Sequence, residues 1–200
     1  MLADKMIIVA DRLGIPVLLI LNKSDLDGST LSELQEEYRA AVSQILTVST
    51  VTGEGIASLK QMLQGTLTVF AGQSAVGKSS LLNALDGAER MTTGDVGERS
   101  GRGRHTTRHA EIFACGSALI ADTPGFSMLD GADLDLDLDE ADYYYTEFFA
   151  LSRDCRYNRC THTHEPDCAV KAALADGRLS RARYDRYLRL REELKNAKPY

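Results

Sequence analysis

Residues 67–85 read Leu-Thr-Val-Phe-Ala-Gly-Gln-Ser-Ala-Val-Gly-Lys-Ser-Ser-Leu-Leu-Asn-Ala-Leu. The apolar run 67–71 predicts a buried strand, and residues 78–85 predict a helix. The pattern G-x-x-x-x-G-K-S lies between them, and its glycines let backbone N–H groups converge on phosphate oxygens. The start of the helix adds free N–H groups and a favourable dipole. The stretch therefore predicts a nucleoside triphosphate site made of Gly72, Gln73, Ser74, Ala75, Val76, Gly77, Lys78, Ser79 and Ser80.

Within this phosphate loop, two side chains have distinct expected roles. Lys78 is expected to reach the β- and γ-phosphates, where it would also assist catalysis, and the Ser79 hydroxyl is expected to bind Mg²⁺. The pattern does not identify the base.

A second motif, Asn22-Lys23-Ser24-Asp25, predicts that the base of the nucleotide is guanine. It follows the apolar run 17–21, which predicts a strand buried on both faces. The Asp25 carboxylate can accept hydrogen bonds from guanine N1–H and the exocyclic amine, whereas adenine lacks this donor pair. Lys23 can lie across the base, and Asn22 can tie this loop to the phosphate loop. The segment 49–55 predicts backbone donors to the guanine oxygen, with Ser49 and Thr50 as candidates.

The order of these motifs is unusual, because the guanine motif precedes the phosphate loop. In an ordinary GTPase the phosphate loop comes first. The sequence therefore predicts a circularly permuted P-loop GTPase of the α/β class, with a mostly parallel sheet and flanking helices. Residues 2–13 carry apolar side chains at helical spacing and predict the helix before the guanine motif. The strand expected to precede that helix is not in the sequence, so we expect an N-terminally truncated domain with a gap in its sheet.

Two further segments are expected to sense the γ-phosphate. Asp122-Thr-Pro-Gly125 follows an apolar segment, which suits a water-mediated Mg²⁺ contact by Asp122 and a γ-phosphate contact by the Gly125 N–H. The segment 101–109 offers Thr106 and Thr107, of which Thr107 is slightly favoured as a Mg²⁺ ligand. Phe126 stands where Ras-like enzymes place a water-orienting glutamine. His105 is the nearest imidazole and a candidate for the hydrolysis step, although an ordinary solvent-exposed histidine is an equal interpretation.

A second metal signal lies near the end of the chain, in Cys155-x₄-Cys160-x-His162-x₅-Cys168. Three thiolates and one imidazole match a closed, tetrahedral Zn²⁺ site of the structural kind. Three cysteines would leave one unpaired in a disulfide framework, and four ligands leave no open position for catalysis. His164 is an alternative ligand and Glu165 a less favoured one.

Composition sets the remaining expectations. With 44% hydrophobic residues, the 200-residue chain can bury one substantial core and a small appendage. No apolar run approaches the ~20 residues of a membrane span. We expect a GTPase domain over residues 1–129 and a small helical zinc-binding domain over 130–200. Residues 178–198 carry eight Lys/Arg and three Asp/Glu, and we expect a helix whose apolar side chains pack inward while its arginines face outward. The apolar side chains are those of Tyr184, Tyr187, Leu188 and Leu194. This pattern is typical of a helix that contacts RNA phosphates or simply of a solvated basic helix.

The motifs together resemble the RsgA (YjeQ/YloQ) family of circularly permuted GTPases. The stretches that carry the resemblance are NKSD, TGEG, GQSAVGKSSLLNAL, GRGRHTTRH, DTPGF and CRYNRCTHTHEPDCAV, in that order. The resemblance implies GTP hydrolysis in late maturation of the 30S ribosomal subunit, stimulated by that subunit, with 16S rRNA as partner. It also implies a zinc role for the Cys₃His set and supports His105. Family members carry an OB-fold RNA-binding domain before the GTPase domain, which this sequence lacks.

We therefore expect a cytoplasmic monomer that binds GTP, GDP, Mg²⁺ and one Zn²⁺, with no DNA or membrane partner. Loss of the γ-phosphate is expected to control binding to and release from the subunit. Two other functions remain open at this stage: a P-loop ATPase, and a non-hydrolysing zinc-containing RNA-binding module.

Overall fold

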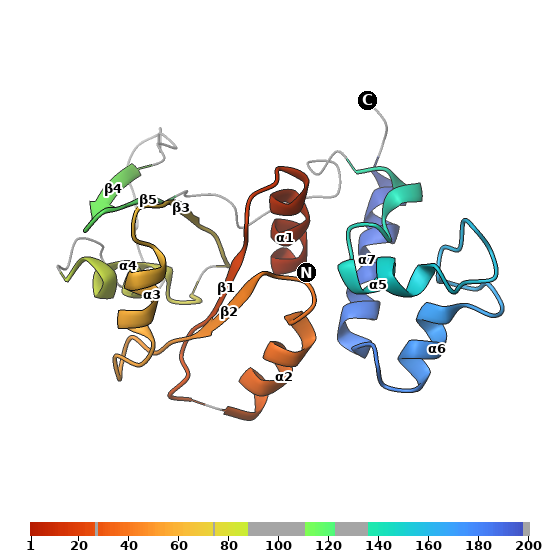
Figure 1. Cartoon of the computed structure of the whole chain (residues 1–200), viewed down its shortest axis with the longest axis horizontal. Helices are drawn as coiled ribbons and strands as arrows, with labels where there is room; N and C mark the ends of the chain where they lie inside the picture. Colours follow the sequence, from red (N-terminus) through yellow and green to blue (C-terminus); the bar gives the residue numbers. More distant parts are fainter. Residues whose placement is uncertain (27, 74, 88–110, 123–135, 198–200) are drawn as a thin grey trace, which may run out of the picture. The chain divides into compact units, whose positions relative to one another are not determined.

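The computed structural model describes residues 1–26, 28–73, 75–87, 111–122 and 136–197, apart from the side chains of Glu111, Phe113 and Asp122. Helices and strands alternate over residues 2–86, two consecutive strands lie in the described residues 111–122, and the elements within residues 136–197 are all helical (Figure 1). The elements are α1 (Leu2–Arg12), β1 (Leu18–Leu21), α2 (Gly28–Tyr38), β2 (Gln44–Thr47), α3 (Ile56–Met62), β3 (Leu67–Phe70), α4 (Lys78–Asp86), β4 (Glu111–Cys115), β5 (Ala118–Asp122), η2 (Leu138–Glu140), α5 (Thr146–Ser152), α6 (Ala169–Ala175) and α7 (Arg181–Asn196).

The chain forms two compact units, and each unit combines segments that are separated in sequence. Unit 1 contains residues 1–19, 32–45 and 129–200, and unit 2 contains residues 20–31 and 46–128. The first helix therefore groups with the C-terminal helices by its contacts. The linear boundary expected near residue 129 stays a prediction about domains, because compactness alone does not say which segments fold independently.

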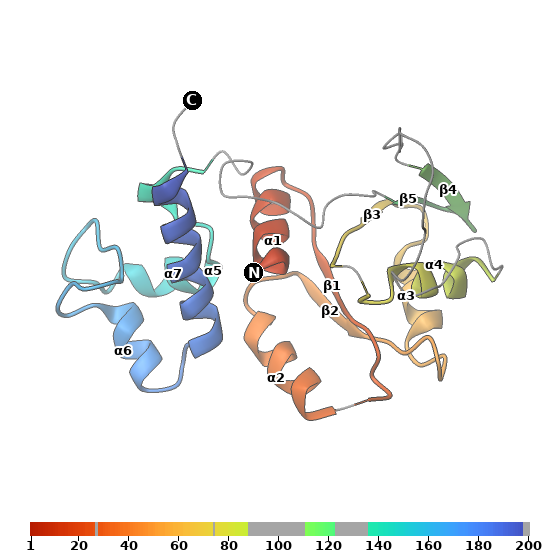
Figure 2. The ribbon, with the colours of Figure 1, turned by 180° about the vertical axis from the view of Figure 1, so that it is seen from behind.

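Unit 2 is built on a three-stranded sheet in the order β3-β5-β4. Strands β3 and β5 are parallel and pair Leu67 with Leu119, whereas β4 and β5 are antiparallel. Figure 2 shows the same strands from behind, with α3 and α4 nearby. The apolar side chains of Leu81, Leu82 and Leu85 on α4 are buried. Because β3 ends where the phosphate loop begins, this sheet positions the loop.

Strands β1 and β2 form a separate two-stranded sheet. The described strands thus form two sheets. The prediction that residues 17–21 are buried on both faces is wrong for most of the strand, since only Leu21 is buried and the others are half-buried. Neighbouring strands pair along the edges of a strand, whereas packed helices cover its faces, and the half-burial of residues 17–20 shows that this cover is incomplete along β1.

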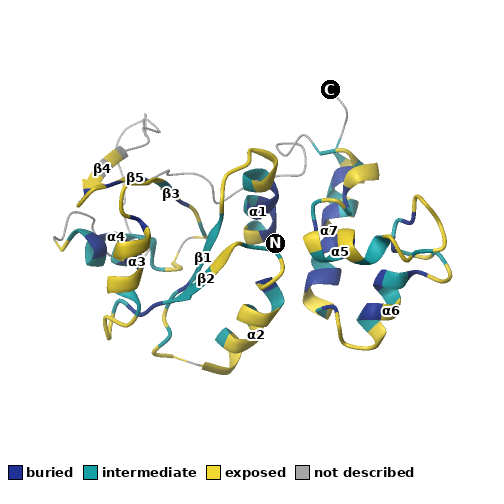
Figure 3. Ribbon diagram, viewed as in Figure 1, coloured by how far each residue is buried: buried dark blue, intermediate teal, exposed yellow. Residues whose placement is uncertain are grey.

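Unit 1 has an aromatic core. The side chains of Tyr145, Phe148 and Tyr187 are almost wholly buried, and their rings lie 4.7–5.5 Å apart between centroids. Figure 3 shows buried segments along α7 and in α1. Ile8 of α1 belongs to the same cluster of buried residues. None of the helices in the described ranges is long and apolar enough to cross a membrane.

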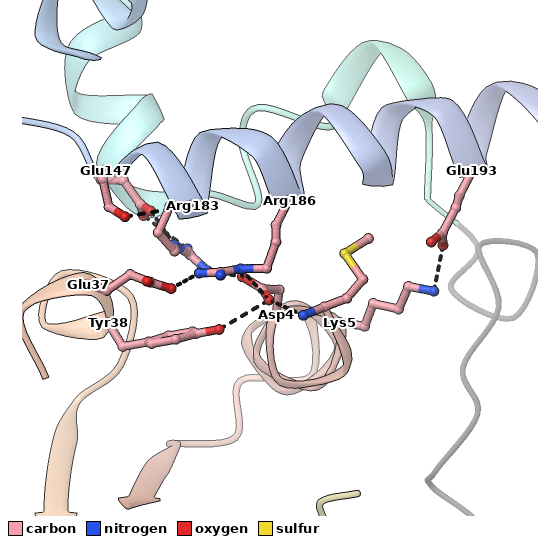
Figure 4. Close-up of polar contacts among 10 residues, drawn as sticks. Asp4, Lys5, Glu37, Tyr38, Glu147, Arg183, Arg186 and Glu193 are labelled. Atoms are coloured by element: carbon pink, nitrogen blue, oxygen red, sulfur yellow. Dashed lines mark hydrogen bonds and ion pairs between the residues drawn. The ribbon is translucent and has the colours of Figure 1, made fainter. Parts of the chain in front are cut away.

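Helix α7 departs from the expected pattern of apolar residues inside and arginines outside. Tyr184, Tyr187 and Leu194 are buried, but so is Arg183, which is 2% exposed. The physical reason is a set of carboxylates that compensates the buried charge (Figure 4). Arg183 donates to Asp4 of α1 and, at 2.6 Å, to Glu147 of α5.

Arg186 extends this charged cluster. Its Nε donates to the buried carboxylate of Asp4 at 3.0–3.1 Å, and its Nη2 pairs with Glu37 of α2. The Tyr38 hydroxyl donates to Asp4 at 3.2 Å. Side chains of four helices, α1, α2, α5 and α7, therefore meet at one buried ionic cluster (Figure 4).

Candidate nucleotide site and metal centre

The phosphate loop leads from β3 into α4 through a left-handed residue. Gly77 caps α4 with φ 92°, a conformation that favours glycine. A Cβ at Gly77 would also collide with the side-chain amide of Asn22. The left-handed φ therefore favours glycine here, and a larger residue would also require the Asn22 side chain to shift. The first backbone N–H groups of α4 remain available as hydrogen-bond donors, and donors in this position can bind an anion.

The side chain of Lys78 folds back onto the phosphate loop that precedes it. Its Nζ donates to the carbonyl oxygen of Gly72 at 2.5 Å and approaches that of Gln73 at 3.5 Å. These carbonyl groups hold the ammonium beside the loop N–H groups. An ammonium in this place attracts the phosphate oxygens of a bound nucleotide.

The guanine motif is hydrogen-bonded to the phosphate loop. The Asn22 amide donates to the Val76 carbonyl at 2.9 Å, and Lys23 Nζ donates to the Ala75 carbonyl at 3.1 Å. Lys23 and Ala75 both have left-handed backbone conformations, with φ of 67° and 65°. Such conformations cost free energy in non-glycine residues and cluster at functional sites. The structure thus brings together residues of two loops that are 52–54 positions apart in sequence.

Ser49 organises the second guanine loop. Its hydroxyl donates to Asp25 Oδ1 at 2.5 Å and accepts from the N–H groups of Val51 and Thr52 at 3.2 and 3.1 Å. Ser49 is wholly buried, whereas Asp25 is exposed. A carboxylate has about four lone-pair sites, so Asp25 keeps the capacity to accept two further hydrogen bonds from guanine. Thr50 follows Ser49 and is half-buried.

Sequence reasoning missed one connection between these loops. The Ser24 hydroxyl donates to Glu54 Oε2 at 2.7 Å, and the Ser49 N–H donates to the Glu54 carbonyl at 3.0 Å. Glu54 therefore bridges the guanine motif and the turn around Ser49. The glycines around Glu54 mark a turn in the sequence, but no local pattern there identifies Ser24 as the partner of its side chain.

Several predicted site residues lie outside the described residues. Ser79 and Ser80 are half-buried in the first turn of α4, and the β5 backbone extends to Asp122. The described residues do not include Ser74, His105, Thr106, Thr107, Gly125, Phe126 or the Asp122 side chain. The assignments of these residues to the γ-phosphate, Mg²⁺ and hydrolysis stay predictions.

The four predicted zinc ligands converge in unit 1. One ligand atom from each of Cys155, Cys160, His162 and Cys168 lies within 4.8 Å of all the others. His162 Nδ1 is 3.4 Å from Cys168 Sγ and 3.7 Å from Cys155 Sγ. In a tetrahedron with zinc–ligand bonds of about 2.0–2.3 Å, neighbouring ligand atoms are about 3.5–3.8 Å apart. The geometry and the donor types therefore fit one Zn²⁺.

Cys160, His162 and Cys168 are buried and Cys155 is half-buried, so ionised thiolates here need a cation to compensate their charge. Burial raises the pKa of the Cys160 thiol to about 12 and also raises the pKa of Cys168. A bound divalent cation compensates such buried thiolates, so metal binding and folding of the loop are coupled.

The surroundings of His162 fix its orientation. Its Nε2 faces Asp142 Oδ2 at 3.5 Å, an arrangement of carboxylate behind histidine that orients metal ligands. The Tyr184 hydroxyl donates to the His162 carbonyl at 2.6 Å, and the Tyr187 hydroxyl donates to the Thr161 carbonyl at 2.8 Å. Helix α7 therefore holds the zinc loop through two tyrosine hydroxyl groups.

The alternative ligands His164 and Glu165 are not in the cluster. Glu165 instead accepts hydrogen bonds from the Thr161 N–H at 2.8 Å, the Thr161 hydroxyl at 2.5 Å and the Thr163 N–H at 3.0 Å. Partial burial opposes ionisation, but these donors outweigh it and lower the pKa of Glu165 to about 2. Glu165 shapes the loop around the ligands as a carboxylate.

A family model described as RsgA GTPase matches residues 1–132. The "Small ribosomal subunit biogenesis GTPase RsgA" of Geobacillus thermodenitrificans is 42% identical, over 99% of this chain and 68% of that protein. The protein of the same name from Ruminiclostridium cellulolyticum is 40% identical, over 100% of this chain and 65% of its own length.

Two solved structures are similar. The crystal structure of YjeQ from Thermotoga maritima has a TM-score of 0.76 and 30% identity, covering 98% of this chain and 66% of that one. The structure of YloQ, described as a circularly permuted GTPase, has a TM-score of 0.74 and 31% identity, covering 100% of this chain and 64% of that one. The chain spans about two thirds of the length of these relatives, and it belongs to the RsgA GTPase family.

Proposed function

We propose that this chain is the GTP-hydrolysing part of a protein that acts in biogenesis of the small ribosomal subunit. The observation that carries the proposal is the hydrogen-bonded pair of loops. The guanine motif donates to the phosphate loop from Asn22 and Lys23, so one rigid arrangement can hold both ends of a guanine nucleotide. The names of the relatives support the biological role, because both describe a GTPase of small-subunit biogenesis.

In this mechanism the chain's residues bind and orient the nucleotide. Asp25 accepts from the guanine edge while Ser49 holds its carboxylate in place. Lys78 and the N–H groups at the start of α4 hold the phosphates. Ser79, Thr107 and Asp122 are the residues that would hold Mg²⁺, which would supply positive charge to compensate the phosphates. His105 is the proposed group for positioning water, with Gly125 contacting the γ-phosphate.

The nucleotide state is proposed to control association with the small subunit, through contacts with 16S rRNA. DTPGF leads directly into the segment before the zinc loop, so a change at the γ-phosphate can reach that domain through the chain. We propose action as a monomer in the cytoplasm, without a DNA or membrane partner.

Two measurements test this proposal. Competition of unlabelled GTP, GDP and ATP against labelled GDP should give displacement by the guanine nucleotides only, and equal displacement by ATP would remove the guanine assignment. Sedimentation with small subunits should then show different affinity with a non-hydrolysable GTP analogue and with GDP. Equal affinity in the two states would contradict control by the γ-phosphate.

A further inference from the structure

The third residue of the guanine motif, Ser24, is held by two hydrogen bonds to the loop that follows β2. Its hydroxyl donates to Glu54 Oε2 at 2.7 Å, and its backbone N–H donates to the Val48 carbonyl at 3.1 Å. The first of these bonds has a carboxylate as acceptor, and charge-assisted bonds are the stronger class. The residue directly before the base-reading Asp25 is therefore fixed from a second loop.

The backbone of Glu54 is fixed as well as its side chain. Its carbonyl accepts from the Ser49 N–H at 3.0 Å, and its own N–H donates to the Thr52 hydroxyl at 3.3 Å. Gly55 follows with φ 71°, and a Cβ there would lie 2.3 Å from the Thr47 carbonyl oxygen. The turn therefore needs glycine after Glu54, and the turn sets the place from which the Glu54 side chain extends.

These contacts close a ring of four residues that contains the base-reading carboxylate. Ser24 and Asp25 are joined by a peptide bond, and Asp25 Oδ1 accepts from the Ser49 hydroxyl at 2.5 Å. The backbone of Ser49 then bonds to Glu54, whose carboxylate bonds back to Ser24. Glu54 thus holds Asp25 from both sides, through its chain neighbour and through its hydrogen-bond partner. The members of such a ring cannot rotate independently.

Recognition of guanine benefits from this restriction. Asp25 is exposed, so its side chain would otherwise have to be ordered when the nucleotide binds. A carboxylate that accepts from both N1–H and the exocyclic amine must lie in the plane of the base, whereas one hydrogen bond makes a smaller demand on its orientation. A side chain that is ordered beforehand does not lose that freedom on binding. The ring should therefore favour the two-bond interaction over the one-bond interaction.

We propose that Ser24 and Glu54 form a positioning pair, which sets selectivity for guanine by holding the Asp25 carboxylate in the plane of the base. The inference rests on the proposed function, because it requires a bound guanine nucleotide, and it assigns a role to two residues that do not themselves contact the base. If Glu54 only closed the turn, its backbone would suffice, and its side chain could be replaced without effect on selectivity.

The test compares GDP with inosine diphosphate, which lacks the exocyclic amine, by competition against labelled GDP on the whole zinc-loaded chain. The ratio of the two dissociation constants reports the second hydrogen bond to Asp25, and it cancels any change in phosphate binding or net charge. The wild type should prefer GDP at least roughly tenfold, because a hydrogen bond to a charged group has this magnitude. Glu54→Ala and Ser24→Ala should each lower the preference roughly threefold to fivefold.

The double variant should lose no more than either single variant, because both changes remove the same hydrogen bond. Glu54→Gln keeps an acceptor oxygen for the Ser24 hydroxyl and should keep most of the preference. Glu33→Ala is the matched control: it removes an exposed glutamate on α2, with the same change in charge, and should keep the wild-type ratio. Ser24→Ala breaks the bond from the other side, so it tests the proposal even where Glu54→Ala loses nucleotide binding.

Three results would overturn the positioning pair: an unchanged preference in both alanine variants, additive losses in the double variant, or a preference in Glu54→Gln as low as in Glu54→Ala. In each case a wild type that prefers GDP keeps the guanine assignment, and only the role of Ser24 and Glu54 is rejected. Equal binding of GDP and inosine diphosphate by the wild type would instead reject base reading by Asp25, and the positioning pair with it.

Discussion

Arg183 is the residue whose replacement has the most definite expected cost. It is 2% exposed and faces two carboxylates, with Glu147 at 2.6 Å and Asp4 also in contact. Its guanidinium carbon also lies 4.5 Å from the Tyr145 ring centroid. Arg183→Met keeps the apolar stem and removes the charge, which leaves two buried acidic groups short of a partner. Breaking a buried ion pair on one side costs about 3–5 kcal/mol.

We expect the lower end, about 3 kcal/mol, because Arg186 still pairs with Asp4. The assay is urea unfolding of the zinc-loaded protein followed by far-ultraviolet circular dichroism, since the chain has no tryptophan. Arg181→Met is the matched control on the same helix, where the side chain is 74% exposed and the expected cost is about 0–1 kcal/mol. Adding Glu147→Met to Arg183→Met should recover part of the loss. Equal unfolding midpoints for the two single variants would refute this account of the buried cluster.

The pH dependence gives a second readout of the same cluster. Burial alone would raise the pKa of Asp4, but the charges of Arg183, Arg186 and the N-terminal ammonium outweigh it and lower the pKa below its ordinary value of 3.8. At pH values between the lowered pKa and the ordinary value of 3.8, the carboxyl group of Asp4 binds a proton more readily in the unfolded chain than in the folded chain. The free energy of unfolding therefore rises with pH over this range. The contribution is complete above the ordinary pKa and is lost as pH falls through the lowered one. Arg183→Met should make this acid loss of stability shallower.

Three further changes test the sites. Lys78→Ala should abolish tight GTP and GDP binding, because it removes the ammonium that attracts the phosphates. The fold should persist, because Lys78 begins α4 and is not part of the buried core. Unchanged nucleotide affinity would reject the phosphate-loop assignment. Asp25→Asn should weaken selectivity for guanine and favour xanthine, whose oxygen can accept from the amide, and a GTP preference over XTP equal to that of the wild type would exclude Asp25 from base reading. Cys160→Ser, or reversible removal of the metal by a chelator, should disorder the zinc loop without loss of GDP binding. The reason is that the zinc ligands and the nucleotide loops belong to different compact units. Loss of GDP binding, or purified protein without stoichiometric zinc, would contradict this prediction.

The sequence predicted local elements where the pattern was strong. Residues 2–13, 67–71 and 78–85 match α1, β3 and α4 to within one residue at each end. The zinc ligands were predictable because cysteine and histidine spacing restricts the metal chemistry. These signals are local or depend on residue type, so one sequence suffices to detect them.

Long-range compensation was not predictable in the same way. A basic helical pattern in residues 181–196 indicates exposed arginines, yet Arg183 is buried because Asp4 and Glu147 lie opposite it in space. The partner Asp4 is 179 residues away in sequence, and no periodicity encodes that pairing. The role of Glu54 was missed for the same reason, since its partner Ser24 comes from a separate loop.

GTP turnover with and without purified small ribosomal subunits tests the central claim most directly. The account predicts slow release of phosphate by the chain alone, a clear increase when subunits are added, and no turnover by Lys78→Ala under either condition. Saturating subunits that leave turnover undetectable in a protein that binds GDP and zinc would contradict the claim that this chain hydrolyses GTP on the small subunit.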